Sequence, residues 1–328
     1  MRIIKLIIFV LVSFALLSQS KLYGADKERL IRNVLVYKLH DSVDSVRINL
    51  SLNGDRNPVG YETELMMAVC DDKLCANVSL KINWDLAGNY SRFDTILGKP
   101  LTKFDHKRFT DADYKKLDQI LKDRNSILRA LEKNDLIDKS VHVKSTIVDA
   151  VTGATPSTIK NAVVEGAVYS SYTLWHFVFG TLGDSIRANT HRIYCDQIAQ
   201  QLLQSSNFET QFFALKQWSK DDFETHSDLL FQVIRKSVPL IKAYVINKMP
   251  LPFSDQKMNQ KFIALFPELD AYSKSIFLDR IAESKPIAEV FFPLKNSNLS
   301  DLEMNQREKY LYALKKFEIK DLTFKFLK

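Results

Sequence analysis

The 328-residue sequence contains little cysteine, glycine or proline: three cysteines, nine glycines and nine prolines. Three cysteines without CxxCH or paired CxxC spacing argue against a c-type haem, a zinc site and an iron–sulfur cluster. Scarce glycine and proline, with 46% hydrophobic residues, argue for an ordered globular chain. The sequence also lacks the Gly-x-Ser-x-Gly and HExxH patterns, so a hydrolase has little support.

Neither the charge nor the histidines are concentrated in one place. The formal net charge is +7, and 46 Lys and Arg residues are interleaved with 39 Asp and Glu residues. Nucleic-acid binding favours a concentrated basic stripe, so we expect no nucleic-acid partner. The six histidines, at positions 40, 106, 142, 176, 191 and 226, stand apart from one another and from cysteine. We therefore expect no metal site.

The N-terminus has the pattern of a signal peptide. Arg2 and Lys5 precede an apolar run at 6–17, and small and polar residues follow at 18–25. The run is short for a membrane span, which needs roughly 20 apolar residues, although retention as an uncleaved anchor is the alternative. We expect residues 1–24 to be removed and the mature protein to be periplasmic or otherwise extracytoplasmic.

Residues 25–160 mix strand and helix signals in the manner of an α+β domain. Alternating apolar residues predict strands, and the run Thr110-Asp111-Ala112-Asp113 resembles a capping box at the start of a helix. Strands are expected at 61–69, 76–84 and 142–148, and strands or a helix-to-strand entry at 30–39 and 46–52. Helical segments are expected at 110–121 and 126–131.

The cysteines fit an oxidising compartment. Cys70 and Cys75 lie across the expected tip of the hairpin formed by 61–69 and 76–84, where a disulfide is sterically plausible. A structural disulfide is the preferred interpretation, and a redox-active dithiol is the alternative, although the spacing is not CxxC. Cys195 is expected to be a buried thiol in an amphipathic helix.

The most informative segment is Asp149-Ala150-Val151-Thr152-Gly153-Ala154-Thr155-Pro156-Ser157, followed by Thr158. Its pattern is Asp, two free positions, Ser or Thr, Gly, Ala, then Thr or Ser. This pattern resembles the flavin acceptor site of the FMN-binding domain family, which occurs in sodium-pumping quinone reductases and related electron-transfer complexes. The resemblance covers roughly residues 55–180.

The resemblance implies a covalent FMN cofactor. A separate flavin transferase would join FMN by a phosphoester to the hydroxyl of Thr155. The implied cofactor-binding residues are Asp149, Thr152, Gly153, Ala154, Thr155, Ser157 and Thr158.

The residues themselves suit such an attachment. Gly153 and Ala154 add no bulk, so an enzyme can approach the neighbouring hydroxyl closely. Pro156 favours a first helical position, which predicts Thr155 as the N-cap of a helix over 157–179, where a phosphate would meet free N–H groups. The alternative is that Thr155 only caps a helix.

A second segment, 93–109, places Phe93, Phe104 and Phe109 among basic residues and His106. Such a group could line a flavin or quinone-type pocket. The preferred interpretation is a loop that packs its phenylalanines against the sheet.

From residue 161 the pattern becomes helical. A hydrophobic helix is expected at 167–177, and Ser-x-x-acid caps are expected at Ser206, Ser219 and Ser300. Helices of this size with short turns look like an α-solenoid of the HEAT class, without a repeated consensus. The aromatic residues Phe208, Phe212, Phe213, Trp218 and Phe223 are expected in the core, and a partner-binding groove is the alternative.

These patterns predict a signal peptide at 1–24, an α+β FMN-binding-like domain at 25–160 and an all-α, HEAT-like domain at 161–328. The expected function is that of an exported bacterial flavoprotein, an electron-transfer module and carrier more than a stand-alone enzyme. Its expected partners are the flavin transferase and a redox or envelope protein. The alternative is a non-redox envelope scaffold whose helical repeats bind a partner.

Overall fold

The computed structural model describes residues 31–38, 45–69, 77–103, 106–136, 138–143, 152–154, 157–291 and 302–320. The chain divides into two compact units, which we call the sheet unit (Met1–Ile193) and the helical unit (Tyr194–Lys328). Within the described ranges, no helix is both long enough and apolar enough to cross a bilayer. The expected signal peptide, residues 1–24, lies outside them.

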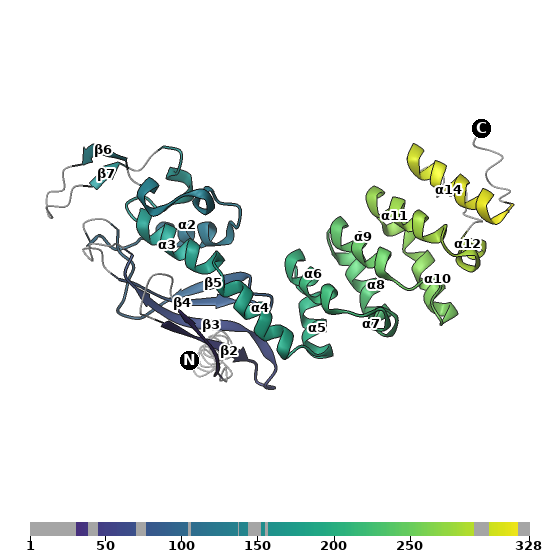
Figure 1. Cartoon of the computed structure of the whole chain (residues 1–328), viewed down its shortest axis with the longest axis horizontal. Coiled ribbons are helices and arrows are strands. Elements are labelled where there is room, and N and C mark those ends of the chain that lie inside the picture. Colours follow the sequence, from purple (N-terminus) through teal and green to yellow (C-terminus); the bar gives the residue numbers. More distant parts are fainter. Residues whose placement is uncertain are drawn as a thin grey trace, which may run out of the picture. The chain divides into compact units, whose positions relative to one another are not determined.

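The sheet unit is built on one antiparallel sheet whose five strands follow one another in chain order (Figure 1). The strands are β1 (Ile31–Lys38), β2 (Ser45–Leu52), β3 (Pro58–Met67), β4 (Val78–Trp84) and β5 (Tyr90–Thr95). The β3–β4 pair confirms the expected hairpin, and β1 and β2 confirm the first two expected strands. The α+β character of this region is therefore confirmed.

Alternation along the strands sends one set of side chains into the core. Ile48, Leu65, Leu80 and Ile82 are almost fully buried on this face. Three helices lie beside the sheet: α2 (Asp111–Lys122), α3 (Val168–Phe179) and α4 (Leu182–Arg192) (Figure 1). Hydrogen bonds tie α2 and α4 to the strands.

Two tyrosines, of which Tyr61 is buried and Tyr90 half-buried, form these hydrogen bonds. The Tyr61 hydroxyl on β3 lies 2.8 Å from the Thr190 hydroxyl on α4, and the Asn189 amide donates to it at 2.9 Å. The Tyr90 hydroxyl on β5 donates to Asp118 on α2 at 2.8 Å. Burial is the main cause that raises the pKa of both tyrosines, so each remains a neutral hydroxyl.

Helix α2 begins as the sequence predicts. Thr110 is its N-cap, and the Thr110 and Asp113 side chains complete a capping box. Burial acts to raise the pKa of Asp113, but the interactions with Lys103 and Thr110 outweigh it and lower that pKa. The expected helical segment after α2 is a short 3-10 helix, η2 (Ile127–Ala130), followed by a second, η3 (Lys133–Leu136).

The boundary between the units falls at 193/194, later than the 160/161 boundary expected from the sequence. Helices α3 and α4 belong to the sheet unit because their apolar side chains complete its core. Leu174 and Trp175 of α3 are buried, as are Leu182 and Ile186 of α4. The change from strands to helices along the chain therefore precedes the boundary between the hydrophobic cores.

The helical unit consists of short helices joined by short turns, which confirms an all-α second region. The helices are α5 (Asp196–Leu203), α6 (Phe208–Gln217), α7 (Lys220–Thr225), α8 (Ser227–Lys236), α9 (Pro239–Lys248), α10 (Gln256–Ala264), α11 (Ala271–Ile281), α12 (Lys285–Phe291) and α14 (Met304–Phe317), with the 3-10 helix η5 (Phe266–Glu268) after α10.

Helices α6, α9, α11 and α14 form one row, each packed on the next (Figure 1). They begin about 32 residues apart along the chain, at 208, 239, 271 and 304. Their buried positions recur with the same period: Ala214, Val245, Phe277 and Tyr310 are all core residues. The repeat is therefore one of burial, without a repeated sequence motif.

An aromatic cluster fills the later part of this core. Phe262 stacks on Phe277 with ring centroids 4.3 Å apart, and Phe266 and Phe291 pack on Phe277 at 5.3 and 5.6 Å. Such rings bury large apolar areas, so this cluster contributes strongly to the stability of the unit.

Of the three caps expected here, one is confirmed. Ser219 caps α7 with Asp222 in a capping box. The cap of α6 is Asn207 instead of Ser206, because the Asn207 side chain accepts the Glu209 backbone N–H. The cap of α14 is Glu303, which forms a capping box with Gln306, and Ser300 lies outside the described residues.

Two burial expectations for this unit need correction. Phe223 is buried, but Phe208 is 45% exposed and Phe212, Phe213 and Trp218 are half-buried. Cys195 is a free, exposed thiol at the N-cap of α5, before the first buried turn of that helix.

Candidate functional site

The middle of the flavin-acceptor segment is a short strand. Thr152–Ala154 form β7, which pairs antiparallel with β6 (Asp138–Val143) through Thr152 opposite Val143 and Ala154 opposite Asp138. The upstream strand thus begins before the 142–148 expected from the sequence, and residues 144–151 lie outside the described residues. Asp149 and Thr155 also lie outside them.

The chain after Thr155 does not enter a long helix. Ser157 and Thr158 are exposed turn residues, a 3-10 helix, η4 (Lys160–Ala162), follows, and α3 begins only at Val168. The expectation that Thr155 caps a helix over 157–179 is therefore wrong. The N-cap of α3 is Ala167, and the anion site expected at such a helix N-terminus does not apply to Thr155.

The late start of α3 has a local cause. Gly166 has a φ of 73°, which lies in the left-handed region, and this conformation interrupts any helix running into α3. The Ser171 hydroxyl then accepts the Val164 N–H at 3.0 Å and donates to the Ala167 carbonyl at 3.0 Å. These bonds fix the turn that leads from the acceptor segment into α3.

Helix α3 is also fastened to the residues upstream of β6. The Trp175 indole donates to the Asp123 carbonyl at 2.8 Å, and the Tyr172 hydroxyl donates to the Leu131 carbonyl at 3.1 Å. The His176 Nε2 lies 3.0 Å from the carbonyl oxygen of Leu128, which only accepts, so this nitrogen bears the proton. We call this set of bonds the α3 clamp.

The clamp has two consequences. Burial lowers the pKa of His176, partly offset by the bond to Leu128, so the ring stays neutral at pH 7. Because the clamp joins the segment before β6 to the helix after β7, both arms of the acceptor segment are held by the core of the sheet unit.

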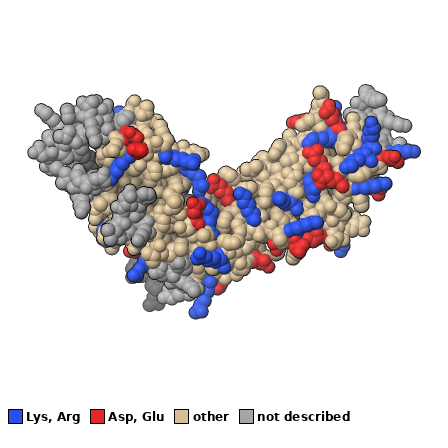
Figure 2. Space-filling model, viewed as in Figure 1, with Lys and Arg blue, Asp and Glu red and all other residues tan. Residues whose placement is uncertain are grey.

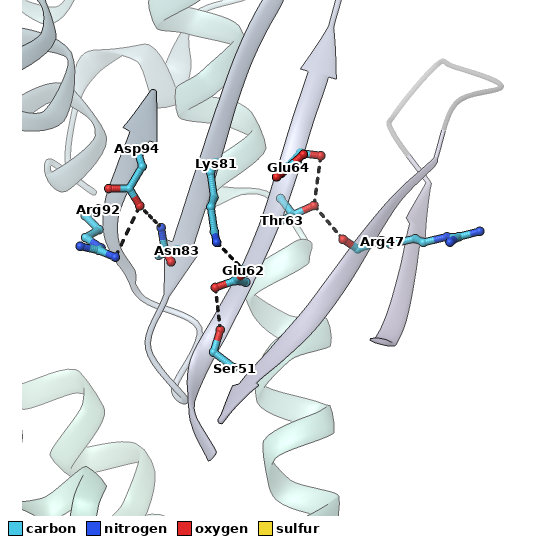
Figure 3. Close-up of polar contacts among 9 residues, drawn as sticks. All are labelled: Arg47, Ser51, Glu62, Thr63, Glu64, Lys81, Asn83, Arg92 and Asp94. Carbon is cyan, nitrogen blue, oxygen red and sulfur yellow. Dashed lines mark hydrogen bonds and ion pairs between the residues drawn. The ribbon is translucent and has the colours of Figure 1, made fainter. Parts of the chain in front are cut away.

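A polar cluster that the sequence analysis did not single out lies on the sheet face opposite the core (Figure 3). Glu62 on β3 is only 2% exposed; its carboxylate accepts from the Ser51 hydroxyl at 2.9 Å and pairs with the Lys81 ammonium at 2.8 Å. The three residues come from β3, β2 and β4. Side chains of the two neighbouring strands therefore hold the Glu62 carboxylate in place.

The cluster continues onto β5. The Asn83 amide donates to Asp94 at 3.2 Å, and Arg92 lies 3.4 Å from the same carboxylate (Figure 3). A cavity of about 480 Å³ lies at the Glu62 end, with Arg47 and Met66 among its lining residues. The charges are balanced, and the Ser51 hydroxyl that donates to Glu62 is itself buried. The alternation of polar residues along these strands is the sequence pattern from which this polar face could have been predicted.

The loop at 93–109 serves packing. Phe93 and Phe109 lie 6.3 and 5.3 Å from the Tyr114 ring on α2, centroid to centroid, as the preferred interpretation expects. His106 is exposed, and Phe104 lies outside the described residues.

Cys70 and Cys75 also lie outside the described residues, so the expected disulfide stays a prediction. Among the residues that the structure does describe, no group of His, Cys, Asp and Glu is arranged to hold a metal ion. Over the face of the molecule shown in Figure 2, cations and carboxylates are intermixed.

Comparison with protein-family models, with curated proteins and with solved structures finds no match for this chain.

Proposed function

We propose that this chain is an exported flavoprotein that carries FMN as a phosphoester on Thr155 and acts as an electron-transfer module. The observation that supports the proposal most is the acceptor segment itself, in which each specified position of the family pattern is met from Asp149 to Thr155. Export follows from the signal pattern at residues 1–24, and a disulfide between Cys70 and Cys75 would suit that compartment.

The backbone around the segment is compatible with attachment by another enzyme. Thr152–Ala154 are extended, and an exposed turn begins at Ser157 and Thr158. A transferase has to bring the Thr155 hydroxyl into its own active site, which favours a projecting segment. The α3 clamp fastens described residues before β6 to the helix that follows β7.

The attachment chemistry balances with FAD as the donor. The Thr155 hydroxyl oxygen forms a bond to the FMN phosphorus, the bond between the two phosphates of FAD breaks, and AMP leaves. The hydroxyl proton is lost to the transferase. FMN supplies the redox chemistry when attached, and the residues of this chain supply its position and surroundings.

The helical unit is the proposed site for docking a redox or envelope partner. Its helices recur about every 32 residues, within the range of α-solenoids, and look like the HEAT class in architecture. The runner-up function is a non-redox envelope scaffold in which the helical unit binds a partner and Thr155 stays bare.

The test is the mass and visible absorption of the mature protein purified from its own host and after co-expression with a flavin transferase. The proposal expects an added mass of FMN less water, a yellow chromophore that survives denaturation, and a modified peptide containing Thr155. Thr155→Ala should remove the flavin, and Thr155→Ser should retain it because the pattern accepts either hydroxyl.

Ser91→Ala is the matched control, since it removes an exposed hydroxyl of the sheet unit outside the acceptor segment and should leave the flavin in place. An unmodified wild-type mass in both preparations would overturn the flavoprotein proposal in favour of the scaffold. Flavin that persists in Thr155→Ala would overturn the assignment of the acceptor residue.

A further inference from the structure

The helical unit contains a cavity of about 500 Å³ beside the C-terminal ends of α6 and α9. This volume lies in the range of small-molecule sites. Its lining includes the buried side chains of Phe223 and Met249 and the half-buried ring of Trp218. The cavity therefore combines apolar surface with an opening to solvent.

The charged lining of this cavity is entirely positive. Lys216, Lys220, Lys248 and Arg280 line it, and among the described residues no Asp or Glu does. The three lysines have no carboxylate partner in the described part of the chain. Three ammonium groups around one cavity raise its local positive potential and favour an anion with more than one charge.

Some lysines elsewhere in the helical unit are paired with carboxylates. Lys242 lies 3.5 Å from Asp270, Lys261 lies 2.6 Å from Asp228, and Lys309 pairs with Asp279. The lysines of the cavity differ from these three in having no carboxylate partner among the described residues.

Helix dipoles account for only part of this arrangement. Lys216 and Lys248 occupy the last turns of α6 and α9, where cations are favourable. Lys220 is the first residue of α7, where the dipole disfavours a cation.

Arg280 adds a fixed cation at the same place. One of its terminal nitrogens donates to the Met249 carbonyl at 2.6 Å, and the other pairs with Glu283. Its Nε is buried and has no hydrogen-bond acceptor among the described residues. The guanidinium is therefore held at the cavity while one of its donors stays unused.

Aromatic rings face the same space and are held in place. Trp218 contacts Phe223 edge-on at 5.5 Å and His226 at 5.1 Å, and Tyr244 contacts Phe212 edge-on at 4.8 Å. Trp218 and Tyr244 both line the cavity and keep part of their surface accessible. Rings restrained in this way provide stacking surfaces for a planar group.

We propose that this cavity binds a small polyanion that carries a planar ring, with the lysines on its charges and Trp218 or Tyr244 on the ring. The charges can be phosphates, as in a nucleoside diphosphate, or carboxylates, as in an aromatic tricarboxylate. The proposal does not depend on the flavin at Thr155, because every residue of the cavity belongs to the helical unit.

Calorimetric titration of the full-length mature protein with four probes tests the proposal. The probes are ADP, benzene-1,3,5-tricarboxylate, inorganic pyrophosphate and adenosine. At least one of the first two should bind more tightly than both pyrophosphate and adenosine, and the tighter of them identifies the anionic group. Affinity should fall as salt rises, because the charges are partly exposed.

The key variant is Lys216→Met, Lys220→Met, Lys248→Met, and its matched control is Lys236→Met, Lys257→Met, Lys315→Met. Both remove three exposed lysines from the helical unit, but the control lysines do not line this cavity. Loss of even one charge-assisted hydrogen bond should weaken binding of the tighter probe by about tenfold or more in the key variant alone.

Equal affinities of the two triple variants, or no binding of any probe by the wild type, would overturn the proposal. Pyrophosphate binding as tightly as both ring-bearing probes would overturn the role of the ring. If the triple variant loses its helical circular dichroism, Lys220→Met alone serves in its place, and an unchanged affinity there would likewise contradict the proposal.

Discussion

At the scale of single residues, buried hydroxyls connect the sheet to its helices. Tyr61→Phe removes the hydroxyl that meets Thr190 and Asn189, and it leaves the fully buried Thr190 hydroxyl without this partner. An unsatisfied buried polar group costs about 1–3 kcal/mol. We expect the free energy of unfolding in urea to fall by that amount.

The control for this change is Tyr37→Phe. Its hydroxyl lies 2.9 Å from the Thr181 hydroxyl in an exposed position, where water replaces the lost partner. We expect a change below about 0.5 kcal/mol, as for a surface substitution. Equal losses in both variants would show that burial of the Tyr61 hydroxyl does not set its contribution.

His176 should make the stability of the sheet unit depend on pH. Burial lowers its pKa below the ordinary 6.5, so between these two values the unfolded chain binds more protons than the folded one. The contribution is complete above pH 6.5 and is lost as the pH falls through the lowered pKa. Denaturation of the wild type from pH 8 to pH 5 should show the unfolding free energy decreasing below pH 6.5.

His176→Gln keeps an N–H donor for the Leu128 carbonyl but does not titrate, so it should reduce this decrease. His191→Gln, at an exposed position of α4, should leave it unchanged. A wild-type profile that is flat across the range, or one that His176→Gln leaves as steep, would contradict a neutral, buried His176.

At the scale of elements, the turn between β4 and β5 approaches α4 closely at Gly88. A Cβ there would lie 2.6 Å from the Gly183 carbonyl oxygen, and the φ of Gly88 is 75°. Gly98 has a similar φ of 78°, but a Cβ there would meet nothing within 4 Å. The two glycines therefore separate backbone strain from steric contact.

Gly98→Ala should cost about 1–2 kcal/mol, the cost of a left-handed conformation for a residue with a Cβ. Gly88→Ala should cost about 1–3 kcal/mol more, because the backbone of α4 has to move away from the turn. Urea denaturation of both variants measures the difference. Equal costs would mean that α4 yields freely at this contact.

The sequence predicts elements well where the periodicity and the capping signals are local. The four N-terminal strands and the capping box of α2 follow from alternation and from the spacing of Thr110 and Asp113. The start of α3 does not follow from such signals. Pro156 favours a helix that starts there, but Gly166 and the Ser171 hydroxyl set a later start for α3. Two local signals compete there, and tertiary contacts decide between them.

The candidate sites divide in the same way. The acceptor segment can be recognised from the sequence because its residues are contiguous. The Glu62–Lys81 pair joins two strands, so it can be predicted only when the register of those strands is known. The lysines of the helical cavity lie up to about 32 residues apart and meet only because the helices repeat at that spacing. Sites assembled from several turns leave no compact pattern in a single sequence.

At the scale of the whole molecule, each unit has its own hydrophobic core. Phe277 lies at the centre of the aromatic cluster of the helical unit, where it contacts Phe262, Phe266 and Phe291. Phe277→Ala should destabilise that unit by about 3–5 kcal/mol through the cavity it leaves. Hydrogen exchange should show faster exchange in α10, α11 and α12, with protection retained in β2, β3 and β4.

The same variant separates the two proposed roles of the chain. Since the acceptor segment and the α3 clamp belong to the sheet unit, flavin attachment at Thr155 should proceed to the wild-type extent in Phe277→Ala, while ADP or tricarboxylate binding in the helical cavity weakens. Intact mass and calorimetry of one preparation measure both outcomes. Loss of flavin together with loss of the helical core would show that the transferase recognises the helical unit as well, because the sheet unit that bears Thr155 would still be folded.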